Sequence, residues 1–226
     1  MSDQMTRWRQ RAGTWTRVPF QFKPELIGPA MHPNKIILHR QGNPGVEGKS
    51  GIEWGNRTGA FSIHRYIDDT VAFEGVPLTN RAFHTKYADG SRADIQAIGI
   101  ETEDESPQSA TLAPGQKYGL SQDTRITLLL VVTKDILPVY PGLLIYEHAD
   151  FDSVYRAEDL GDALNLLDFR ADVADVLAGR EPWRTVGPFA TGKRAPIEWK
   201  PAPPALVVDQ RVAQARDLLT AVMEGR

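Results

Sequence analysis

The residues of this chain that could bind a metal ion are five histidines and a set of carboxylates, because its 226 residues include no cysteine. Without cysteine, the sequence offers no disulfide, no thiol nucleophile and no thiolate ligand. Neutral imidazole is the commonest metal ligand, and a catalytic zinc ion needs three protein ligands and one open position. A metal site in this chain would therefore combine histidine with aspartate or glutamate.

Two of the histidines, His39 and His148, come at the ends of apolar runs that predict buried strands, at residues 35–39 and 143–148. Adjacent strand ends bring together residues that are distant in the sequence. The segment after His148 offers several carboxylates as a third ligand, namely Asp150, Asp152, Glu158, Asp159 and Asp162.

The elements that must position these residues follow an α/β pattern. Further strands are predicted at residues 60–67, 70–73 and 95–102, and a Gly- and Pro-rich loop at residues 42–55. Helical spacing predicts one helix from 122 to 137, capped by Ser121 and ended by Pro138, and another from 164 to 177. The predicted fold is a central mixed β-sheet flanked by helices.

The composition divides the chain into four parts: an N-terminal arm (1–30), a main domain (31–179), a Pro/Gly-rich linker or strap (180–204) and a C-terminal amphipathic helix (205–226). The polar face of the last helix has balanced charges, which favours packing on the domain or self-association as a homo-oligomer over membrane binding.

Charge and hydropathy argue against two classes of partner. The net charge of -3 and the lack of a basic face disfavour nucleic acid. No apolar run approaches the roughly 18 residues that cross a bilayer, so membrane insertion is not expected. The N-terminal arginines precede no apolar segment, so we expect no secretory signal.

Five segments, taken in order, resemble type-2 N-acetylmuramoyl-L-alanine amidases, which share a fold with the peptidoglycan-recognition proteins and include many phage endolysins. They are KIILH (35–39), SIHRYIDD (62–69), GVPLTNRAFH (75–84), AIGIE (97–101) and EHADFDSVYRAEDLG (147–161). Together they cover roughly residues 33–178. The resemblance implies that residues 31–179 form a zinc amidase domain that cuts the amide bond between N-acetylmuramic acid and L-alanine in peptidoglycan.

Carried over residue by residue, the resemblance implies that His39, His148 and Asp159 bind Zn²⁺. Glu101 would be the buried acid that takes a proton from the attacking water. His84 would line the cleft outside the metal shell.

Arg156 or His84 would donate a hydrogen bond to the developing oxyanion. The chain departs from the family pattern around Asp159. Leu160 stands where the family has proline, the spacing from the histidine is one residue longer, and Ala157 replaces a lysine. Arg156 is the nearest cation to that position. Asp162 therefore stays an alternative third ligand.

Each assignment has a structural alternative. Glu101 and Arg156 would form ordinary salt bridges, His84 would be a core histidine, and Trp54 would pack in the core instead of lining a groove. We expect His64 to be structural and His32 to be an exposed loop residue.

At the level of the whole protein, the alternative is a non-catalytic peptidoglycan-binding module of the same fold. A zinc hydrolase of another fold is disfavoured, because the sequence has no H-E-x-x-H helix. The expected setting is a phage endolysin that is made in the cytoplasm without a signal peptide and reaches the cell wall through a phage-encoded pore. A cytoplasmic recycling amidase would have a similar sequence.

Overall fold

The computed structural model describes residues 3–11, 13–40, 48–87, 89–103, 120–154, 160 and 163–186. The strands are β1 (Thr16–Pro19), β2 (Lys35–Arg40), β3 (Arg65–Asp68), β4 (Val71–Glu74), β5 (Ala97–Thr102) and β6 (Leu144–Glu147). The helices are α1 (Asp3–Arg11), α2 (Gly48–Thr58), α3 (Gln122–Leu130), α4 (Leu166–Leu177) and α5 (Trp183–Val186). Shorter pieces are the 3-10 turns η1 (Pro24–Leu26) and η3 (His148–Asp150) and the π-helical segment η2 (Val131–Ile136).

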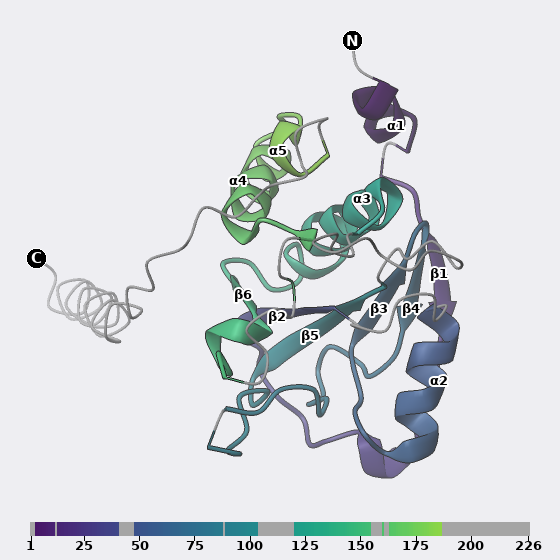
Figure 1. The fold of residues 1–226 in the computed structure, drawn as a ribbon, viewed down its shortest axis with the longest axis vertical. Helices are drawn as coiled ribbons and strands as arrows, with labels where there is room; N and C mark the ends of the chain where they lie inside the picture. The colour runs from purple at the N-terminus through teal and green to yellow at the C-terminus, as the bar shows by residue number, and fades with distance from the viewer. Residues whose placement is uncertain are drawn as a thin grey trace, which may run out of the picture. The chain divides into compact units, whose positions relative to one another are not determined.

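The strands form one six-stranded sheet in the order β1-β4-β3-β5-β2-β6 (Figure 1). Strands β3 and β4 are antiparallel, and every other neighbouring pair is parallel. The predicted mixed sheet flanked by helices is therefore confirmed. Strands β5, β2 and β6 lie side by side and run in the same direction, so their carboxyl ends meet at one edge of the sheet.

Side chains alternate between the two faces of the sheet, and each face has its own core. Ile36 and Leu38 of β2 belong to a cluster with buried residues of α3, η2 and α4. On the opposite face, Tyr66 of β3 packs with Ile52 of α2 and with loop residues such as Phe22. Figure 1 shows α3 and α4 on one side of the sheet and α2 on the other.

Four predicted elements are confirmed with each end within two residues of its predicted position: β2, β5, β6 and α4. Ser121 caps α3 as predicted, since its hydroxyl accepts the Thr124 N–H at 2.8 Å. The loop predicted at residues 42–55 was wrong from residue 48 onward, because helix α2 begins at Gly48. The strand prediction at 60–67 was also too long, since β3 begins at Arg65.

The segment predicted as an N-terminal arm contributes α1 and the edge strand β1, which pairs with β4. Met5 is fully buried, and Arg11 Nη2 donates to Thr127 Oγ1 at 2.7 Å. The described residues belong to one unit, residues 1–193. The predicted domain boundaries stay predictions, and the C-terminal helix at 205–226 lies outside the described residues. Within the described part of the chain, no helix is long and apolar enough to cross a membrane.

Candidate active site

Four residues form a row across one face of the sheet, at the carboxyl ends of its parallel strands. The register pairs Tyr66 of β3 with Glu101 of β5, and Glu101 with His39 of β2. Strand β6 pairs with β2 up to Glu147, so His148 follows beside His39. Neighbouring strands lie about 4.7–4.9 Å apart, and residues in register share a face. The fold therefore brings together three of the predicted site residues: Glu101, His39 and His148.

The two histidines of this row face each other through the same ring nitrogen. The Nδ1 atoms of His39 and His148 lie 3.0 Å apart, and the rings meet at 76°. Both side chains are buried, with 3% and 5% exposure. Two nitrogen ligands about 2.0–2.1 Å from one tetrahedral zinc ion would be about 3.3 Å apart. The observed separation is close to the geometry of two ligands that share one metal ion.

Local contacts fix where each strand presents its histidine. Thr102 Oγ1 donates to the backbone oxygen of His39 at 2.9 Å, which ties the ends of β2 and β5 together. After β6, the Asp150 carboxylate accepts the Glu147 N–H at 3.0 Å in a capping box, and His148 becomes the first residue of η3.

The other ring nitrogen of His39 contacts His84 and Thr85. His39 Nε2 lies 2.9 Å from His84 Nδ1 and 3.1 Å from Thr85 Oγ1, while His84 Nε2 lies 3.5 Å from the Ala97 carbonyl. A carbonyl only accepts, so we assign the hydrogen of His84 to Nε2, and its Nδ1 accepts from His39 Nε2 or from Thr85 Oγ1, which lies 2.7 Å away. This arrangement leaves a lone pair on His39 Nδ1, the atom that faces His148.

The electrostatics of His84 agree with this neutral arrangement. Burial lowers the pKa of His84 well below 6.5, and the neighbouring His39 and His64 lower it further. Its contacts favour a role in orienting His39. Its predicted role as a donor to an oxyanion stays a prediction.

Asp94 anchors the loop that carries His84 and Thr85. Its fully buried carboxylate accepts the backbone N–H groups of His84 at 2.9 Å and Thr85 at 3.3 Å. Arg81 donates to the same carboxylate at 2.7 Å, and Arg92 also contacts it. Sequence reasoning missed Asp94, although two arginines within 13 residues of it are a weak signal of a buried carboxylate that accepts several hydrogen bonds.

Gly99 lies between His84 and a second buried histidine. A Cβ on Gly99 would lie 2.6 Å from two ring atoms of His84, so only glycine leaves room for that ring. The Gly99 N–H donates to His64 Nδ1 at 2.9 Å, and His64 Nε2 donates to the Asn80 carbonyl at 2.8 Å. Burial lowers the pKa of His64 to about 4. These contacts support the structural role predicted for His64.

The remaining predicted site residues fall in different places. Asp159, Asp162 and Arg156 lie outside the described residues. Trp54 is on helix α2 and is 48% exposed, with its ring 6.1 Å from that of Phe61.

Comparison with solved structures identifies the fold. A mutant endolysin from Bacillus subtilis superposes with a TM-score of 0.54 and 17% identity, over 71% of this chain and 99% of that one. The endolysin N-acetylmuramoyl-L-alanine amidase LysCS from Clostridium intestinale URNW gives 0.51 and 15% identity, over 71% and 97%. The catalytic domain of XlyA gives 0.51 and 18%, over 69% and 97%. The chain has the fold of these amidases and endolysins. No protein-family model and no curated protein sequence matches it.

Within this amidase fold, the donor set at the end of the sheet suits a zinc ion in part. His39 and His148 supply two imidazole Nδ1 atoms that face each other. Among the described residues, no group of three or more histidine, cysteine, aspartate or glutamate side chains could hold a metal ion. The predicted carboxylate ligand falls in the part of the chain that is not described.

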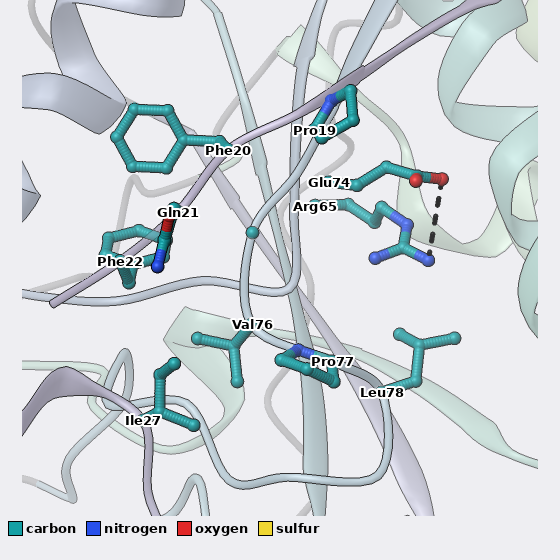
Figure 2. Close-up of a pocket in the computed structure, with 11 residues that line it drawn as sticks. Pro19, Phe20, Gln21, Phe22, Ile27, Arg65, Glu74, Val76, Pro77 and Leu78 are labelled. Carbon is teal, nitrogen blue, oxygen red and sulfur yellow. Dashed lines mark ion pairs between the residues drawn. The ribbon is translucent and has the colours of Figure 1, made fainter. Parts of the chain in front are cut away.

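A separate cavity of about 610 Å³ lies elsewhere in the amidase fold (Figure 2). It is lined by apolar residues such as Phe20, Phe22 and Ile27 together with Gln21, Arg65 and Glu74, and none of the histidines lines it. Its cation, Arg65, donates to Asp135 Oδ2 at 2.9 Å and lies 4.0 Å from Glu74. Because that charge is already paired within the protein, we place the candidate active site at the histidine row.

Proposed function

We propose that this chain is a zinc-dependent N-acetylmuramoyl-L-alanine amidase that hydrolyses the amide bond between N-acetylmuramic acid and L-alanine in peptidoglycan. The observation that carries the proposal is the row of Glu101, His39 and His148, with the two Nδ1 atoms 3.0 Å apart at the carboxyl ends of parallel strands. The amidase fold supports it.

In this proposal His39, His148 and Asp159 hold the zinc ion. When bound, zinc lowers the pKa of a coordinated water to about 7 and polarises the substrate carbonyl. Thr85 and His84 keep the hydrogen of His39 on Nε2, so that Nδ1 stays available as a ligand.

Glu101 is the proposed proton carrier. It is half-buried and in register with His39, so its carboxylate comes from the neighbouring strand on the same face of the sheet. It accepts a proton from the attacking water and donates it to the leaving amine of L-alanine. Arg156 is proposed to stabilise the oxyanion.

The test is digestion of purified cell walls by zinc-loaded protein, with mass spectrometry of the soluble products and metal analysis of each variant. We expect stem peptides that begin with a free L-alanine amine. His39→Ala should lose both zinc and activity, and Glu101→Gln should lose activity but keep zinc. His32→Ala is the matched control, because that histidine is exposed and is not part of the row.

Tight binding to walls without new amino termini would refute the amidase and support the recognition module instead. Reducing ends in place of amino termini would show that a glycosidic bond is cut. For the biological setting, we propose an endolysin that acts on the cell wall after release from the cytoplasm.

A further inference from the structure

Three aromatic side chains gather next to the histidine row. Tyr87 and Phe151 meet edge to face with ring centroids 5.7 Å apart, and Phe151 meets Tyr146 in the same way at 5.5 Å. Tyr146 of β6 pairs in register with Ile37, two residues before His39 on β2, so the side chains of Tyr146 and His39 lie on the same face of the sheet. Phe151 comes three residues after His148. The cluster therefore adjoins the proposed catalytic centre.

The rings are held in place before any ligand binds. The Arg170 guanidinium lies 5.7 Å from the Tyr146 ring centroid, and Arg170 Nε donates to the Ile145 carbonyl at 2.7 Å. Phe151 ends the turn η3, where its N–H donates to the His148 carbonyl at 2.9 Å. A fixed aromatic surface loses little conformational entropy on binding.

Tyr87 is presented by a tight turn. Its N–H donates to the Ser91 carbonyl at 2.8 Å, and its own carbonyl accepts the Gly90 N–H at 2.9 Å. Gly90 has a φ of +84°, which suits glycine in a turn, and Asp89 Oδ1 accepts the Ser91 N–H at 2.9 Å. Tyr87 remains 42% exposed, so part of this anchored ring is open to a ligand.

The charges around the cluster favour a neutral ligand. Asp150 and Asp152 flank Phe151 in the sequence, and the Arg170 guanidinium is already bonded to a backbone carbonyl. Lys86 precedes Tyr87 in a β-bridge, where successive side chains point to opposite sides. A peptide stem carries free carboxylates and would need cations here, whereas a sugar ring offers an apolar face of C–H groups to an aromatic ring.

We propose that Tyr87, Phe151 and Tyr146 form a carbohydrate subsite that stacks against a pyranose ring of the peptidoglycan glycan strand. This inference rests on the proposed amidase function, because it adds the glycan side of the substrate to the same site. The cluster orients the strand so that the lactyl amide reaches Glu101 and the two histidines.

The test measures the affinity for two soluble probes by calorimetry: a neutral glycan oligomer of N-acetylglucosamine, which lacks the free lactyl carboxylates of peptide-free muramic acid, and the free stem peptide. Tyr87→Ala should weaken glycan binding about three- to tenfold, the scale of one aromatic contact. Tyr87→Phe keeps the ring and should stay within about twofold. Phe151→Leu, which keeps an apolar side chain, should also weaken glycan binding.

Trp183→Ala is the control, because it removes an aromatic side chain of 50% exposure on helix α5. It should leave both affinities unchanged. Wild-type protein that binds no glycan, or a Tyr87→Ala variant that loses affinity for the stem peptide only, would overturn the subsite.

The same experiment separates the two proposals. Protein that releases stem peptides from walls, but binds the glycan oligomer equally well with and without the Tyr87 ring, would retain the amidase function and refute the subsite. Glycan binding that depends on Tyr87 without any amide cleavage would retain the subsite and refute the amidase.

Discussion

Two buried histidines, His64 and His39, both contact the ring of His84 and differ in how their own ring nitrogens are used. His64 is saturated by the backbone, since its Nδ1 accepts from Gly99 and its Nε2 donates to Asn80. His39 has its Nε2 held by side chains, while its Nδ1 faces the Nδ1 of His148 at 3.0 Å.

The difference shows how a candidate metal-binding histidine can be distinguished from a structural histidine. A histidine whose two nitrogens are both satisfied by backbone groups stabilises the fold. The Nδ1 atoms of His39 and His148 face each other, and a single hydrogen bond between them uses the lone pair of only one. A bound metal ion would use the lone pairs of both. Burial is the same in both environments and does not distinguish them.

The largest expected effect comes from breaking the Nδ1 pair. His39→Ala and His148→Ala should each lower amidase activity by more than the roughly 10–100-fold that loss of an outer partner costs. The free energy of unfolding of the metal-free protein should also fall, because each change leaves a cavity at a buried position and His39→Ala removes the contacts with His84 and Thr85 as well. Zinc content, wall digestion and urea unfolding measure the three quantities. Variants that keep stoichiometric zinc would contradict the assignment.

For His64, whose ring nitrogens are bonded to the backbone, we expect a loss of stability without a loss of zinc. His64→Ala leaves a cavity and two buried backbone groups without partners, so the free energy of unfolding should fall by about 3–4 kcal/mol. Zinc content and activity per folded molecule should stay within about tenfold of wild type. Equilibrium urea unfolding measures the first quantity. A His64→Ala protein that keeps normal stability but loses zinc would contradict the structural role of His64.

The pH dependence of stability gives the next effect. Burial lowers the pKa of His64 in the folded protein from 6.5 to about 4. Between these values the unfolded chain binds a proton that the folded chain does not, so the free energy of unfolding falls as the pH falls, by up to about 3 kcal/mol. His84, whose pKa is also lowered, acts in the same direction.

Urea unfolding of the metal-free protein between pH 7 and pH 4 tests this. His64→Gln should flatten the pH dependence, and exposed His32→Ala should not. Equal slopes in wild type and His64→Gln would show that His64 is not the group that titrates.

The smallest expected effect, from Gly99→Ala, connects the two environments. The added methyl would press on the His84 ring and on Ile63, which should cost about 1–3 kcal/mol of stability. Because His84 supports His39, zinc affinity should fall as well, by up to about 10–100-fold. Thr102→Ser, a small change at a neighbouring position of β5, is a control that keeps the hydroxyl bonded to His39. Zinc affinity that is unchanged in Gly99→Ala would show that His84 does not position His39.

The sequence predicts the strands of the sheet well and helix α2 poorly. The β-branched run at 35–39 predicts a buried strand, and β2 lies there. Helix α2 was missed because Gly48, Gly51 and Gly55 weaken helix propensity, whereas Gly55 in the fold allows close packing on Phe61. Tertiary contacts therefore outweigh the local preference in this segment.

The strand-end residues of the candidate site could be proposed from the sequence, whereas the loop residues that support them could not. Two strand-end histidines can be found in a sequence because apolar runs precede them. Thr85 and Asp94 have no such pattern, since their roles come from the folded path of a loop, and Gly99 acts within strand β5 by leaving room for the His84 ring. Finding them requires the register of β5 against β2.

The sequence separation of His39 and His148 has a consequence for folding. They lie 109 residues apart and meet only when the edge strand β6 pairs with β2. Closing so long a loop is entropically costly, and contacts of this range form slowly. The proposed pair of ligands is thus absent from any intermediate that has not yet added β6. If the pair binds zinc as proposed, the first metal affinity during refolding would mark the pairing of β6 with β2.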